Sequence, residues 1–242
     1  MPVDFSGPYL KLERAEQHIV ELNAIFDEYV AEATKRMRSN ESRGAVTVTG
    51  GFPRHTPTVL GDAIHNLRVT LDHAYAQLVI QDGGAPTSRT VFPFGGDVQS
   101  IKSSVNGKPK GSQPAEAVVD FILDQLEPFP GGKLMLYDLH RLDILDKHEA
   151  ILPVASAVHA QKVTITGPKS KIVFEGISFI TQNPKATAIN VIGDGMRLED
   201  NSEFSVDILF GPRELKNRPV LQTLTTLRDN VLSALKALET LP

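Results

Sequence analysis

Residues 58–81 read TVLGDAIHNLRVTLDHAYAQLVIQ, and this stretch decides the main features of the fold. Its apolar residues recur at every third or fourth position, a spacing that places side chains on one face of a helix. The apolar stripe consists of Leu60, Ile64, Leu67, Leu71, Ala74 and Leu78. The other side of the same helix carries polar residues, so we expect one face to pack on a core.

Similar periodicity predicts further helices before and after this one. Residues 9–38 form a long amphipathic pattern, and residues 115–126 and 133–152 follow a segment rich in Gly and Pro. Residues 217–241 repeat the pattern near the end of the chain. We therefore expect a bundle of four or five helices, because each predicted helix has an apolar face to bury.

Short runs of β-branched residues predict a different structure between residues 161 and 210. The runs are separated by Gly, Pro and Asn, as is typical of antiparallel strands joined by turns. They cover residues 162–166, 171–174, 188–192 and 204–210. The predicted fold class is therefore α+β, a helical bundle with a small antiparallel sheet inserted before the C-terminal helix.

We expect residues 1–242 to form a single compact domain. Its helical part would span residues 8–155 and include a long loop at 83–114. The inserted sheet would occupy residues 161–210, and the helix at 217–241 would rejoin the bundle. Loops as long as the predicted one are usually functional or mobile.

The loop itself is rich in Gly, Ser, Lys and Pro, with one short strand expected near Val91–Phe94. The stretch from Lys102 to Lys110 contains three lysines. A contact with phosphate is one interpretation of these lysines. Solvation of a surface loop is the favoured one.

The composition excludes several kinds of site. The chain has 242 residues and no Cys, which excludes disulfides, Cys-ligated zinc, iron–sulfur clusters and a thiol nucleophile. The net charge of −4 does not suggest a general electrostatic attraction to nucleic acid. No apolar run approaches the about 18 residues that a membrane span needs, and the N-terminus lacks a signal-peptide pattern. We therefore expect a cytoplasmic protein without a membrane partner.

A first polar stripe lies on the helix at 58–81. It contains Asp62, His65, Asn66, Asp72 and His73, with Arg68 at its border one turn from Asp72. A solvated helix face usually carries flexible Lys and Glu, whereas short polar groups suit defined hydrogen bonds. The stripe is therefore either a candidate site or a solvated face with ordinary pairs between successive turns.

A second polar stripe lies on the helix at 133–152, which is apolar around most of its circumference. Such a helix is usually buried, and buried charge is costly unless it is paired. His140, Asp143 and Lys147 form the stripe, while Asp146 lies near the apolar face. The stripe is either a salt-bridge cluster between helices or a site that faces the first stripe.

Two kinds of chemistry would follow if the stripes face each other. Imidazole and carboxylate groups on facing helices suit Zn, Mn or Fe, although neither HExxH nor a paired ExxH motif occurs. The candidate ligands are His65, His73, His140, Asp143, Asp146 and His148. The other possibility is acid–base chemistry without a metal, with a His as the base and Arg68 stabilising negative charge.

The segments GDAIHNLRVTLDH at 61–73 and LHRLDILDKH at 139–148 resemble a family of bacterial proteins of uncharacterised function. The shared motifs are GDxxHNLRxxLDH and LHxLDxxDKH. The helix that contains Lys11–His18 is similar as well, and the resemblance covers most of residues 8–155. This resemblance implies no particular activity.

The segment Arg68–His73 also resembles the Arg-x4–6-His motif of HEPN-type helical nucleases, which cut RNA without a metal. Val69 stands where that class usually has a polar residue. The resemblance implies that His73 deprotonates a ribose 2′-hydroxyl, that Arg68 neutralises the developing charge and that Asp72 orients one of them. His65 is a further catalytic candidate on the same helix. RNA as a partner and a homodimer with a shared cleft are also implied.

Three functional hypotheses remain open, and no cofactor is assigned. A HEPN-like ribonuclease, of toxin or defence type, predicts that Arg68 and His73 lie close together in an exposed cleft. A metal-dependent hydrolase or oxygenase predicts that the His and Asp residues converge. A non-catalytic binding or scaffold protein predicts that the stripes pair as salt bridges between helices.

Overall fold

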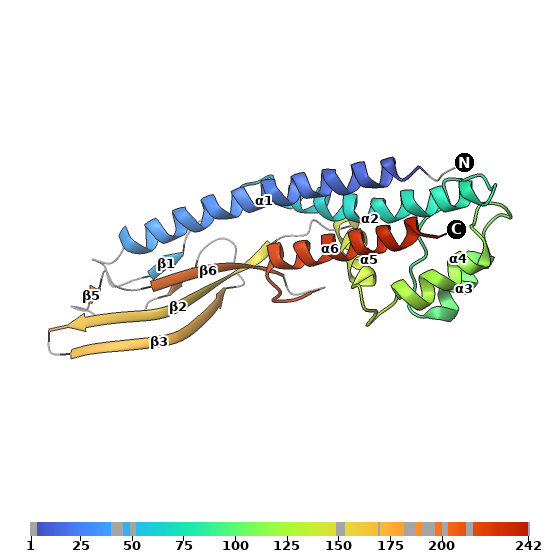
Figure 1. Cartoon of the computed structure of the whole chain (residues 1–242). Coiled ribbons are helices and arrows are strands. Elements are labelled where there is room, and N and C mark those ends of the chain that lie inside the picture. The colour runs from blue at the N-terminus through green and yellow to red at the C-terminus, as the bar shows by residue number, and fades with distance from the viewer. Residues whose placement is uncertain are drawn as a thin grey trace. The chain divides into compact units, whose positions relative to one another are not determined.

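A computed structural model describes residues 4–39, 46–48, 52–148, 153–168, 170–181, 187–189, 197–199, 203–211 and 215–241 (Figure 1). The chain forms two compact units. One unit combines Met1–Val20, Thr58–Ile151 and Gln222–Pro242, and the other combines Glu21–Pro57 and Leu152–Leu221. Neither unit is a continuous segment, and the expected single compact domain stays a prediction.

Helices build the first unit. The helices of the described residues are α1 (Ser6–Ser39), α2 (Thr56–Gln81), α3 (Val98–Asn106), α4 (Glu116–Phe121), a π-helical turn η2 (Ile122–Leu126), α5 (Leu136–His148) and α6 (Val220–Glu239). The second half of α1 belongs to the other unit. The apolar stripe predicted for α2 is confirmed, because all six of its residues are buried in the core. Among the described residues, none of the helices combines the length and the apolar character needed to cross a membrane.

Antiparallel strands build most of the second unit. Four strands form one sheet: β2 (Pro153–Gly167), β3 (Ser170–Thr181), β5 (Arg197–Leu198) and β6 (Glu203–Phe210). Figure 1 shows β2 and β3 as a long hairpin, and β6 pairs with β2 as well. β1 (Val46–Val48) pairs separately with β4 (Thr187–Ile189). The predicted α+β class, with a sheet inserted before the C-terminal helix, is confirmed.

The sheet begins earlier than residue 161, and the preceding helix is shorter than predicted. α5 starts at Leu136 because Met135 has a left-handed backbone with φ 51°. The helix ends at His148, and residues 149–152 lie outside the described part of the chain. β2 already starts at Pro153, where pairing with β6 holds an Ala-rich segment of weak strand propensity in the sheet.

The segment at 83–114 is not the structureless loop that its composition indicates. It contains α3, whose first turn is closed by a reciprocal capping box between Asp97 and Ser100. Ile101 and Val105, one turn apart, are buried and fix the helix on its apolar side. The strand expected near Val91–Phe94 is also wrong, because the structure assigns no strand to these residues.

Candidate functional site

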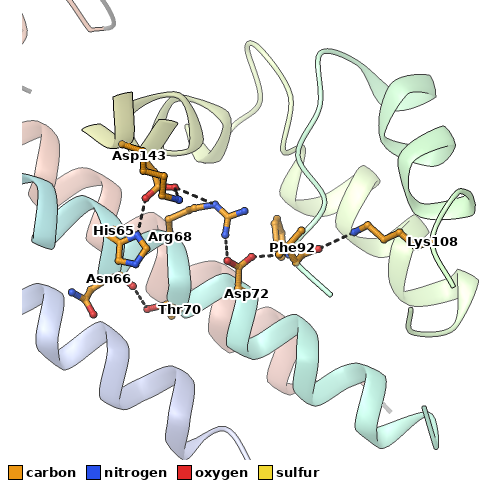
Figure 2. A network of polar contacts seen from close by, with 10 residues as sticks. His65, Asn66, Arg68, Thr70, Asp72, Phe92, Lys108 and Asp143 are labelled. Carbon is orange, nitrogen blue, oxygen red and sulfur yellow. Dashed lines mark hydrogen bonds and ion pairs between the residues drawn. The ribbon is translucent and has the colours of Figure 1, made fainter. Parts of the chain in front are cut away.

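The two polar stripes face each other inside the first unit. His65 on α2 and Asp143 on α5 are joined through their Nδ1 and Oδ1 atoms, which lie 2.9 Å apart (Figure 2). Asp143 is only 2% exposed, whereas the side chain of His65 is 49% exposed. The motifs of the two helices therefore form one polar cluster.

Asp143 is the centre of this cluster. Lys147 lies one turn further along α5, and its Nζ atom donates to Asp143 Oδ2 at 2.6 Å. The Nε atom of Arg68 lies 3.8 Å from the same oxygen, which is an ion-pair distance and too long for a hydrogen bond. A buried carboxylate is costly unless it is paired, and these contacts supply the pairing.

Arg68 is held on several sides. Its Nη1 atom donates to Asp72 Oδ2, and its Cζ atom lies 4.9 Å from the centroid of the Phe94 ring. The residue as a whole is 8% exposed. Burial lowers the pKa of Arg68, and the negative charge of Asp143 opposes that shift. The guanidinium thus lies between two carboxylates and against an aromatic face.

Asp72 links Arg68 to the segment that precedes α3. Its second oxygen, Oδ1, accepts a hydrogen bond of 2.8 Å from the backbone N–H of Phe92. The neighbouring carbonyl of Val91 accepts from Lys108 Nζ at 3.3 Å. Figure 2 shows the resulting network, which runs from His65 at the α2–α5 contact to Lys108 beyond α3.

His140 contributes an aromatic ring to the cluster. The ring stacks on Phe94 with centroids 4.5 Å apart and an interplanar angle of 1°. Burial, followed by the positive charge of Arg68, lowers the pKa of His140 to about 4. Its Nδ1 atom is buried and has no hydrogen-bond partner among the described residues. His140 is therefore uncharged near neutral pH.

The structure places His73 away from Arg68. The two residues are five positions apart on α2, which turns their side chains about 140° from each other. His73 faces α1, where burial and the charge of Lys11 lower its pKa. A Cβ atom added to Gly7 of α1 would lie 3.8 Å from His73 Nδ1. No contact joins His73 to Arg68 in the part of the chain that the structure describes.

The candidate metal ligands do not converge. Within the described ranges, no group of three or more His, Cys, Asp or Glu side chains is placed to hold a metal ion. His65 and Asp143 pair with each other, His140 stacks on Phe94, and His73 faces α1. His148, at the end of α5, is exposed.

Gly61 explains how α2 and α5 approach so closely. A Cβ atom added to Gly61 would lie 2.5 Å from Asp146 Oδ1 and 2.6 Å from Asp146 Cγ. Any larger residue would therefore press on the Asp146 carboxylate. Gly61 of the first motif and Asp146 of the second motif therefore lie in the same contact between α2 and α5.

The sequence patterns did not indicate Phe92, Phe94 or Lys108 as parts of this cluster. The signal for the two phenylalanines was the segment Val91–Phe94, whose β-branched and aromatic residues made it look like a strand, and the signal for Lys108 was the lysine-containing stretch Lys102–Lys110. The two phenylalanines instead pack on one another, with their rings 5.0 Å apart. Long-range packing, which local periodicity does not report, placed them here.

No family model, curated protein or solved structure matches the chain. The two resemblances drawn from the motifs therefore stay predictions, and the geometry of the cluster carries the functional argument.

Proposed function

We propose that the protein has a non-catalytic binding role and that His65, Arg68, Asp72, Asp143 and Lys147 form an interhelical clamp. The observation that carries this proposal is the burial of Arg68 between Asp72 and Asp143. An arginine that stabilises a reacting group must direct its donors to the substrate. Here Nη1 donates to Asp72, and Nε lies at ion-pair distance from Asp143, 3.8 Å, without a hydrogen bond.

The charges of the clamp support the same proposal. Arg68 and Lys147 are matched by Asp72 and Asp143, so the clamp has no surplus positive charge for a phosphodiester. His140 adds none near neutral pH, because its pKa is about 4. Balanced, mutually paired charges are typical of a structural polar network.

The clamp also fixes the segment that precedes α3. Through Asp72 and the N–H of Phe92 it holds the segment before α3, and Val91 in that segment holds Lys108. Binding sites gain precision when a second layer of contacts fixes the residues that present them. We infer that the clamp serves binding by α3, α4 and the segment between them.

The test combines stability with a nuclease assay on the full-length protein. Arg68→Met should strongly lower the midpoint of unfolding. In the nuclease assay, wild-type protein in EDTA should leave single-stranded RNA intact. His65→Asn should lower the midpoint less, because His65 is half exposed. An unchanged midpoint in Arg68→Met would overturn the clamp. RNA cleavage that His65→Asn abolishes would overturn the non-catalytic role.

RNA cleavage without a metal is the second candidate, and the pairing of His65 with Asp143 favours it. A buried carboxylate that holds Nδ1 orients the imidazole and leaves Nε2 to take a proton. In this proposal His65 is the base for a ribose 2′-hydroxyl, the role that the HEPN resemblance gives to His73. Lys147, whose side chain is 52% exposed, would face the phosphate.

The matched control for this candidate is His55→Asn, because His55 is an exposed histidine outside the cluster. Cleavage in EDTA should be lost in His65→Asn and kept in His55→Asn and His73→Asn. Equal activity in all three variants would trace the cleavage to a contaminant and reject His65 as the base.

Assembly and location are also part of the proposal. The HEPN resemblance implies a homodimer, which light scattering of the purified protein would measure directly. The absence of Cys fits a reducing compartment such as the cytoplasm. Fractionation of the native host would test that location.

A further inference from the structure

A cavity of about 390 Å³ lies between α3, α4 and the segment that joins them. Its lining includes Lys102, Val105, Lys108, Lys110, Val119 and Asp120. Cavities of this size hold small organic molecules. The three lysines, for which the sequence favoured solvation in a surface loop, thus line the same cavity.

The wall of the cavity between α3 and α4 is fixed by contacts with the end of α2 and the loop after it. Gly111 O accepts from the N–H of Ala85 at 2.9 Å, and Ser112 O accepts from Thr90 Oγ1 at 3.1 Å. Asp82 accepts from the N–H of Ala115 at 2.5 Å. A wall held in this way loses little conformational entropy when a ligand binds.

Lys108 is held at the cavity by a backbone carbonyl and an aromatic ring. Its Nζ atom donates to Val91 O and lies 6.0 Å from the centroid of the Tyr75 ring. Burial lowers the pKa of Lys108, and the nearby charge of Arg68 lowers it further. Among the described residues no carboxylate pairs with Lys108, and a partly buried ammonium of this kind is stabilised by an anion that enters the cavity.

The other charges of the lining leave a small positive surplus. Lys102 is paired with Asp120 at 2.9 Å, so these two charges offset each other. The remaining charged residues of the lining are Lys108, Lys110 and Glu116, which together carry one net positive charge. Lysine binds phosphate as a compact point charge. Among the described residues, the lining of this cavity includes three lysines that can act in this way.

We propose that this cavity binds a small phosphorylated molecule, with Lys108 and Lys110 at the phosphate and Val105 and Val119 against its less polar part. The volume accommodates a ligand up to about the size of a mononucleotide. Glu116 on the rim would accept a hydrogen bond from an amino or hydroxyl group of the ligand. This inference rests on the proposed binding role and names its ligand class.

The first experiment measures unfolding midpoints and titration calorimetry of the full chain with AMP, ribose 5-phosphate and inorganic phosphate. Adenosine and ribose are the uncharged controls. At least one phosphorylated compound should raise the midpoint, because a ligand that binds the folded state stabilises it. No shift with any of the three at about 10 mM would overturn the proposal.

Variants then separate the cavity from general surface attraction. Lys110→Met removes one of the two charges at the phosphate, so it should weaken binding about tenfold, a loss of about 1.4 kcal/mol. Because Lys110 is exposed, its replacement leaves the fold intact. Lys236→Met on α6 is the matched control and should bind normally. Asn106→Trp keeps every lysine but adds a large ring to an exposed residue of the lining, so it should abolish binding. Equal affinities in Lys110→Met, Asn106→Trp and wild type would overturn the site.

These outcomes are distinct from failure of the clamp. The clamp proposal fails if Arg68→Met leaves the unfolding midpoint unchanged, which is measured without ligand. The cavity proposal fails if wild-type protein binds none of the phosphorylated compounds, whatever the result for Arg68→Met.

Discussion

The imidazole of His65 on α2 contacts the carboxylate of Asp143 on α5 across a separation of 78 positions, with Nδ1 and Oδ1 2.9 Å apart. Asp143 is buried, and it also forms ion pairs with Lys147 and Arg68. A single carboxylate thereby joins two helices whose motifs are remote in the sequence. The strength of this arrangement can be measured residue by residue.

Asp143→Leu should be strongly destabilising. Removing the carboxylate leaves Arg68 buried with Asp72 as its remaining anion, and loss of one partner of a buried pair costs about 3 kcal/mol or more. Urea unfolding at neutral pH measures this change. Asp62→Asn is the control, since Asp62 is exposed on the same polar stripe and its replacement should stay within about 0.5 kcal/mol. Similar unfolding free energies for the two variants would contradict a central role for Asp143.

Arg68→Lys should also destabilise, although it keeps the positive charge. A lysine has no planar group to stack on Phe94 while it also faces both Asp72 and Asp143. We expect a loss of about 2 kcal/mol, measured by chemical denaturation. Arg228→Lys is the control on α6, because Arg228 is partly exposed and its surface pairing with Glu16 should make the exchange nearly neutral. A neutral Arg68→Lys would show that charge alone is enough at this position.

Gly61→Ala should destabilise the contact between α2 and α5. The added Cβ would lie 2.5 Å from Asp146 Oδ1, so the carboxylate or the helix must move, at a cost of about 1–3 kcal/mol. Gly96→Ala is the matched control, because a Cβ atom at Gly96 meets nothing within 4 Å. Thermal unfolding of both variants decides the point. Equal midpoints would mean that the Asp146 carboxylate or the helix moves aside here without cost.

His140 should make stability depend on pH. Burial lowers its folded pKa to about 4, so the unfolded state, with an ordinary pKa near 6.5, binds more protons between these values. Its contribution is complete above about pH 6.5 and is lost as the pH falls toward 4, up to about 3 kcal/mol. His140→Phe keeps the ring against Phe94 and removes the titration. The difference in unfolding free energy between wild type and His140→Phe should therefore change between pH 7.5 and 4.5, and a constant difference would contradict the burial of His140.

Much of the helical unit follows from local pattern. The stripe from Leu60 to Leu78 predicts both the helix and its buried face, because helical periodicity and apolar side chains determine which side faces the core. Pro- and Gly-rich turns indicate most helix boundaries. Boundaries such as the start of α5 at Leu136 depend on the left-handed backbone of Met135, which propensity does not report.

The sequence by itself also identified the polar residues of both stripes, because Asp, His and Arg at helical spacing are unusual on a solvated face. Only the tertiary structure decided which of them meet. It joined His65 to Asp143, buried Arg68 against Phe94 and turned His73 toward α1. It also formed α3 and the lysine-lined cavity from a segment whose composition indicates a loop. The reason is physical: local propensity and periodicity act over one or two helical turns, whereas these contacts arise from packing between segments far apart in the chain.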